Sequence, residues 1–60
     1  MYTAKQKYEA IERELSYRRR VYARRVEDGQ MTQKQADFQI DIFEAIRDDY
    51  DKEQVEERLL

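Results

Sequence analysis

The residue types that perform chemistry are few in this chain, and acids and arginines dominate them. The sequence contains neither histidine nor cysteine, which excludes thiolate nucleophiles, zinc fingers and histidine acid–base pairs. Two carboxylate pairs, Glu9 with Glu12 and Asp48 with Asp51, have the spacing that brings side chains together on a helix. Metal sites in helical bundles usually combine such glutamates with a histidine. We therefore expect no enzymatic activity, no cofactor and no bound metal.

A block of five arginines within residues 17–25 offers binding chemistry instead. Guanidinium groups bind carboxylates and phosphates bidentately, and tyrosine rings stack on nucleobases. Our candidates for polar contact with a partner are Arg13, Arg19, Arg20 and Arg24. The alternative is that these side chains are solvated and pair with nearby acids such as Glu9 or Asp28.

The charges are segregated along the sequence. Residues 1–30 hold 8 basic and 5 acidic side chains, a net charge of +3, whereas residues 31–60 hold 4 and 9, a net charge of −5. The whole chain has a net charge of −2, which opposes nucleic-acid binding, since such domains are usually strongly basic.

The elements that position these side chains follow from the composition and the helix-end signals. The 60 residues include no proline and a single glycine, Gly29, close to the midpoint, which predicts two helices joined by one turn. Thr3 with Gln6, and Thr32 with Gln35, have the spacing of capping boxes. We predict an all-α antiparallel hairpin forming a single domain over residues 1–60. Its first helix covers about 4–27, its turn 28–32 and its second helix about 33–57.

Apolar residues recur at alternating steps of three and four along both predicted helices, as in coiled-coil seams. The predicted core consists of Tyr8, Ile11, Leu15, Tyr22, Ile40, Phe43 and Tyr50. Three arginines, Arg18, Arg25 and Arg47, also occupy seam positions. Because burying an unpaired guanidinium is costly, each is expected to reach solvent or a carboxylate.

An antiparallel register about Gly29 predicts partners for two of these arginines. It brings Arg47 near Glu14, and it places Arg18 level with Asp41 and Glu44.

A second apolar strip lies beside the seam and consists of Tyr17, Val21, Phe38, Ile42 and Ile46. The apolar arc of the second helix spans roughly 200°, more than one partner helix can cover. We therefore expect this strip to form an interface. Homodimerisation into a four-helix bundle is the leading prediction, and docking on a different protein is the alternative.

The middle of the sequence resembles a known group of proteins. Residues 19–37 read RRVYARRVEDGQMTQKQAD, and Ile40, residues 43–46 and residues 49–50 follow. This combination resembles short helical-hairpin proteins encoded by bacteriophages and prophages, in which Arg-Arg-Val-Tyr precedes a Gly-x-Met-Thr turn and an Ala-Asp helix that ends near Asp-Tyr. Members of that group often carry proline where this chain has Ala23, so we expect a straighter first helix here.

The resemblance implies a small phage accessory protein that binds and inhibits a host bacterial protein of the defence or regulatory machinery. A non-catalytic protein-binding module is thus the predicted function. A nucleic-acid-binding hairpin dimer that uses the arginine block is the alternative. The sequence shows no signal peptide and no apolar run near the roughly 18 residues of a membrane span, so we expect no membrane partner and a location in the bacterial cytoplasm.

Overall fold

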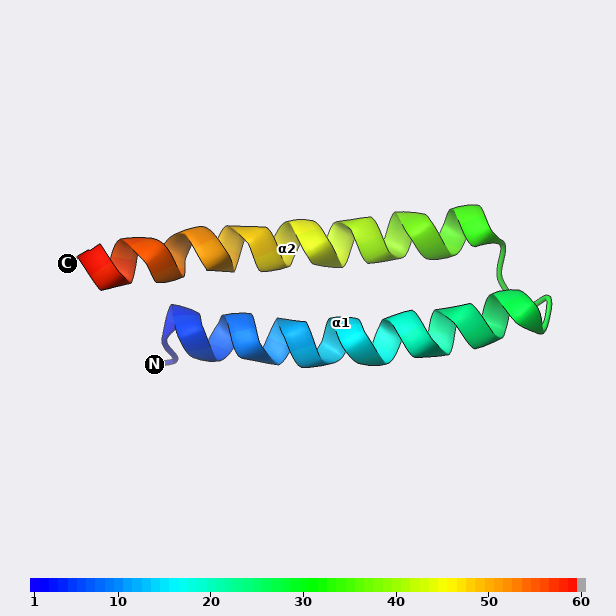
Figure 1. The fold of residues 1–60 in the computed structure, drawn as a ribbon, viewed down its shortest axis with the longest axis horizontal. Helices are drawn as coiled ribbons and strands as arrows, with labels where there is room; N and C mark the ends of the chain where they lie inside the picture. The colour runs from blue at the N-terminus through cyan, green and yellow to red at the C-terminus, as the bar shows by residue number, and fades with distance from the viewer. Residues whose placement is uncertain (60) are drawn as a thin grey trace.

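The fold is an antiparallel hairpin of two long helices. The computed structural model describes residues 1–59, in which α1 (Ala4–Glu27) and α2 (Gln33–Leu59) run side by side in opposite directions (Figure 1). Over these residues the chain forms no strand, which confirms the all-α prediction. Helix α1 has the predicted range, and α2 extends two residues beyond the predicted end at residue 57.

Both helices begin at the capping boxes expected from the sequence. The backbone N–H of Thr3 donates to Oε1 of Gln6 over 2.9 Å, and the N–H of Gln6 donates to Oγ1 of Thr3 over 3.1 Å. Thr32 and Gln35 make the same reciprocal pair over 3.0 and 3.1 Å. Each threonine therefore satisfies a backbone donor that the helix leaves without a partner.

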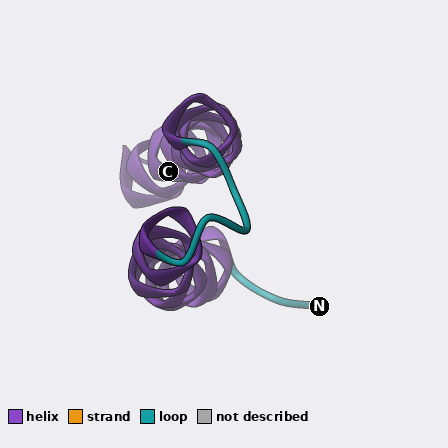
Figure 2. Cartoon of the chain, turned by 90° about the vertical axis from the view of Figure 1, so that its right-hand side faces the viewer, coloured by secondary structure: helices purple, strands orange, loops and turns teal. Residues whose placement is uncertain are grey.

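The turn between the helices depends on Gly29, whose φ is +76°. The N–H of Gln30 donates to the carbonyl of Arg25 over 2.8 Å, and the N–H of Gly29 donates to that of Val26 over 3.1 Å. These two bonds form a Schellman motif, in which a left-handed residue ends a helix. The short loop after it leads directly into α2 (Figure 2).

The hairpin is a thin rod with a small core. Its extents are 48 × 16 × 14 Å. Its radius of gyration is 14.1 Å, whereas a compact 60-residue domain would have one of about 10 Å. The buried apolar residues are Ala4, Leu15, Tyr22 and Ala36.

The predicted core is therefore only partly enclosed. Leu15 and Tyr22 are buried as expected. The other predicted core residues are half-buried, namely Tyr8, Ile11, Ile40, Phe43 and Tyr50. A single layer of two helices leaves the edges of its seam open to water, so the seam positions away from its centre stay accessible. Neither helix, over residues 1–59, is both long and apolar enough to cross a membrane.

Candidate binding surface

The second apolar strip forms one long side of the hairpin, which we call the apolar face (Tyr17, Val21, Phe38, Ile42 and Ile46). Phe38 is 62% exposed, Tyr17 57% and Ile42 40%. Val21 and Ile46 are half-buried at the edge toward the seam. Large apolar side chains gathered on one surface are typical of an interaction site.

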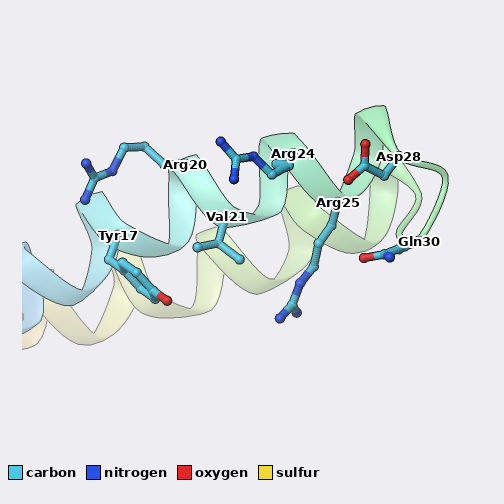
Figure 3. Close-up of a pocket in the computed structure, with 7 residues that line it drawn as sticks. All are labelled: Tyr17, Arg20, Val21, Arg24, Arg25, Asp28 and Gln30. Carbon is cyan, nitrogen blue, oxygen red and sulfur yellow. The ribbon is translucent and has the colours of Figure 1, made fainter.

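Two shallow grooves bring the α1 and α2 parts of the apolar face together at the turn end. Tyr17 and Val21 line the larger groove, of about 460 Å³, and Phe38 lines the smaller one, of about 280 Å³. Arg25 and Gln30 line both grooves, so the grooves adjoin. In Figure 3, Tyr17, Val21 and Arg25 extend to one side of α1, and the guanidinium groups of Arg20 and Arg24 lie along the other edge of the larger groove.

The four predicted contact arginines have different surroundings, although all four are exposed. Arg19 is 3.5 Å from Glu44 on α2 and is held in an ion pair. Among the side chains that the structure describes, Arg13, Arg20 and Arg24 have no carboxylate at ion-pair distance. Arg20 and Arg24 line the larger groove and Arg13 lines neither, so the structure does not gather the four arginines into one site.

Arg18 lies in the seam, where it bridges the two helices by stacking. Its guanidinium lies 4.3 Å from the centroid of the Phe43 ring on α2. One terminal nitrogen donates to the hydroxyl of Tyr22 over 2.9 Å, and the other lies 3.4 Å from Glu14. Its buried Nε has no hydrogen-bond partner among the described residues.

Arg18 is therefore level with residues 41–44, as predicted, but it meets a ring there. Its carboxylate partner, Glu14, belongs to its own helix. Arg25 makes no ion pair with the side chains that the structure describes. It is exposed, and its guanidinium lies 5.9 Å from the ring of Tyr22, beside the grooves.

The opposite long side of the hairpin is closed by a network of charges, which we call the ion-pair face (Glu12, Arg19, Glu44, Arg47 and Asp48). Arg47 lies 3.4 Å from Glu12 on α1, 3.7 Å from Glu44 and 3.2 Å from Asp48. Glu44 also pairs with Arg19, so the network crosses between the helices twice.

The predicted pairing of Arg47 with Glu14 is wrong, because the two acids lie on different edges of α1. Glu12 precedes Arg19 by seven residues and shares its edge, whereas Glu14 precedes Val21 by seven and shares the edge of the apolar face. Arg47 turns toward the edge where Glu44 and Asp48 add two further carboxylates.

Electrostatics within this network shift two pKa values. Burial lowers the pKa of Arg47, but its hydrogen bonds to Asp48 and the charges of Asp48, Glu12 and Glu44 outweigh burial and raise that pKa overall. The charge of Glu12 raises the pKa of the Tyr8 hydroxyl above its ordinary value, and burial and the charge of Asp51 add to the increase.

The ion-pair face was not predicted from the sequence. The signal was present as heptad spacing between Glu12 and Arg19 and as the helical spacing of Glu44 and Arg47. A second contact was also not predicted: the ammonium of Lys7 lies 5.8 Å from the ring of Tyr50 across the seam.

Two carboxylate pairs were considered for catalysis or metal binding, namely Glu9 with Glu12 and Asp48 with Asp51. Among the side chains that the structure describes, no group of three or more from histidine, cysteine, aspartate or glutamate is placed to hold a metal ion. Asp48 is engaged by Arg47. The arrangement offers recognition by apolar surface and guanidinium groups.

Comparison with known proteins adds no assignment to this surface. No protein-family description matches the chain, and no significant similarity to a curated protein or to a solved structure was found.

Proposed function

We propose that the chain is a non-catalytic protein-binding module whose binding surface is the apolar face. One observation carries the proposal: Tyr17, Phe38 and Ile42, large side chains on both helices, are 57%, 62% and 40% exposed, and helical periodicity places them on the same side of the hairpin. Leaving them in water has a cost of about 25 cal/mol per Å² of apolar surface, which a partner removes.

The first partner is a second copy of the chain, and the product is a four-helix bundle. The hairpin has an accessible surface of 5044 Å², whereas a compact monomer of its 7.4 kDa mass would expose about 4200 Å². The excess of about 800 Å² is close to the area that each partner buries in a standard protein interface. Covering one face of each hairpin would bring the surface to that of a compact protein.

The alternative occupant of the same face is a bacterial host protein, which the module inhibits. The support is the resemblance of residues 19–50 to phage and prophage hairpins, together with the exposed guanidinium groups of Arg20 and Arg24 beside the apolar face. Charged groups around an apolar patch steer association and select the partner. This function places the protein in the bacterial cytoplasm.

The test compares the wild type with Ile42→Asp by light scattering and by affinity capture of host proteins. The substitution places a charge in the middle of the apolar face, so the dimer mass falls to 7.4 kDa and partner capture is lost. Ala23→Asp adds the same charge at an exposed position outside the face and keeps both properties. A mass and partner set unaffected by Ile42→Asp would refute the proposal.

A nucleic-acid-binding dimer is the second candidate, and one observation favours it. Arg13, Arg20 and Arg24 are exposed and unpaired among the described side chains, and Arg20 and Arg24 flank an exposed tyrosine ring at Tyr17. The test is binding of RNA and DNA oligonucleotides over a salt series. Binding that weakens steeply with salt and is lost in Arg20→Gln/Arg24→Gln would favour this candidate, and absence of binding at low salt would remove it.

A further inference from the structure

The apolar face has opposite charges at its two ends. Along α2, at about 100° per residue, Asp49, Glu53 and Glu56 fall within the same arc of roughly 60° as Phe38 and Ile42. The three acids therefore extend the apolar line toward the chain termini. All three are exposed.

The turn end of the same face is basic. Arg20, Arg24 and Arg25 line the larger groove beside Tyr17 and Val21, and Asp28 is the one carboxylate in that lining. Figure 3 shows the guanidinium groups of Arg20 and Arg24 reaching away from the helix axis. From the turn to the termini, the face is thus basic on α1, apolar in the middle and acidic on α2. Arg13 shares the arc of Arg20 and Arg24 on α1 and lies nearer the middle of the rod.

Neither charged end is neutralised inside the hairpin. Over the described residues, no ion pair involves Arg20 or Arg24, and none involves Asp49, Glu53 or Glu56. The ion pairs that do form lie on or beside the seam and on the opposite side, at the ion-pair face.

We infer that a second copy of the chain covers the apolar face in antiparallel orientation, so that the turn end of each hairpin lies over the terminal end of the other. This inference rests on the proposed dimer and specifies its geometry. A two-fold axis across the middle of the face repeats every contact, and both basic grooves then meet acidic ends. In the parallel orientation, arginines would lie over arginines and acids over acids, and like charges facing each other at an interface oppose association.

The test uses a charge-swapped variant, Arg20→Glu/Arg24→Glu/Asp49→Lys/Glu53→Lys, mixed with the wild type after joint refolding. Native mass spectrometry counts the two homodimers and the mixed dimer. In the antiparallel arrangement, the variant matches itself and repels the wild type at both ends. We expect homodimers, with mixed dimers about tenfold below the statistical proportion.

A matched control moves the same kinds of charge outside the face. Lys5→Glu/Asp41→Lys exchanges charges at two exposed positions and is expected to mix statistically with the wild type. Circular dichroism checks that each variant is helical.

Each outcome decides a different point. An excess of mixed dimers overturns the antiparallel orientation, because parallel copies attract their charge-swapped partner, and the proposed dimer stands. A statistical mixture of the charge-swapped variant with the wild type also overturns the inference. A wild type that stays monomeric overturns both the inference and the proposed dimer.

The salt dependence of the wild type gives an independent measurement that needs no variant. Raising the ionic strength from about 0.05 to 0.5 M screens the charges, so the antiparallel dimer is expected to dissociate more readily, by about tenfold in its dissociation constant. A dimer that tightens with salt would identify like charges at the interface and contradict the inference.

Discussion

The two long faces of the hairpin differ in what completes them. On the ion-pair face, Arg19 and Arg47 reach across the seam to Glu44 and Glu12, so the charges of that face are met within one chain. On the apolar face, Phe38 and Ile42 stay exposed. Two residues along a helix correspond to a rotation of about 160°. Arg19 is two residues from Tyr17 and from Val21, and Glu44 is two residues from Ile42 and from Ile46. The two faces therefore lie on nearly opposite sides of each helix.

The difference shows that periodicity and burial are separate properties. Both faces have regular helical spacing, and only the three-dimensional arrangement shows which face has its interactions satisfied within one chain. The apolar face, whose large side chains stay exposed, is the one that indicates a partner.

Leu15, beneath both faces, gives the largest expected effect. It is fully buried, so Leu15→Ala is expected to lower the free energy of unfolding by about 2–5 kcal/mol, through lost burial and the cavity left behind. Chemical denaturation followed by circular dichroism measures the loss. Val55→Ala, at a position 44% exposed, is the control and should cost less than about 1 kcal/mol.

Ile42→Ala, measured in the same series, sharpens the comparison of the faces. We expect its cost to lie nearer that of Leu15→Ala, because the second copy that we propose would bury the Ile42 side chain. A cost equal to that of Val55→Ala would indicate that the Ile42 side chain stays exposed to water.

The seam hydrogen bond between Arg18 and Tyr22 has the next largest expected effect. A double-mutant cycle of Arg18→Met and Tyr22→Phe isolates this bond, which is 2.9 Å long. We expect a coupling energy of about 1 kcal/mol, typical of a hydrogen bond in a partly buried site. Additive single effects would mean that Arg18 acts through its contacts with Phe43 and Glu14.

The ion-pair face is expected to contribute less. Arg47→Met removes the bridge to Glu12 and should cost about 0.5 kcal/mol at low salt, since partly exposed ion pairs are weak. In 1 M salt, the wild type and the variant should converge, because the Debye length falls to about 3 Å. Arg58→Met, at an exposed position, is the control. A cost that persists in high salt would point to packing of the Arg47 side chain.

Tyr8 gives the smallest effect, and it depends on pH. The charge of Glu12 raises the pKa of its hydroxyl, so the folded chain holds this proton more tightly than the unfolded chain does. The resulting stability is fully present below the ordinary tyrosine pKa of about 10 and is lost as the pH rises through the raised value. Between pH 9 and 11, the melting temperature of Tyr8→Phe should therefore fall less than that of the wild type. Tyr2→Phe, where the ring is exposed, should follow the wild type.

The helix ends were predictable because their determinants are local. Thr3, Thr32 and Gly29 each act through hydrogen bonds or backbone geometry within a few residues, so the sequence spacing carries the whole signal. The antiparallel arrangement follows from the short turn.

The extent of the core and the charge pairing were less predictable, because both depend on three-dimensional packing. Seam spacing marks Leu15 and Phe43 alike, yet Phe43 is half-buried, since two helices cannot surround every seam position. The partner of Arg47 depends on which edge of α1 its side chain approaches. Glu12 and Glu14 lie at similar heights along the hairpin, so the register alone does not distinguish them. The joining of the two grooves by Arg25 and Gln30 likewise needs the turn in place.

The Schellman turn at Gly29 also has a kinetic consequence. Contacts beside the turn close the shortest loops, and each pair farther along the helices, out to Lys7 and Tyr50, closes a longer one. Because loop-closure entropy grows with length, the helices are expected to zip from Gly29 outward, and low contact order makes such folding fast. Substitutions beside the turn should therefore slow folding, whereas those near the termini should mainly accelerate unfolding.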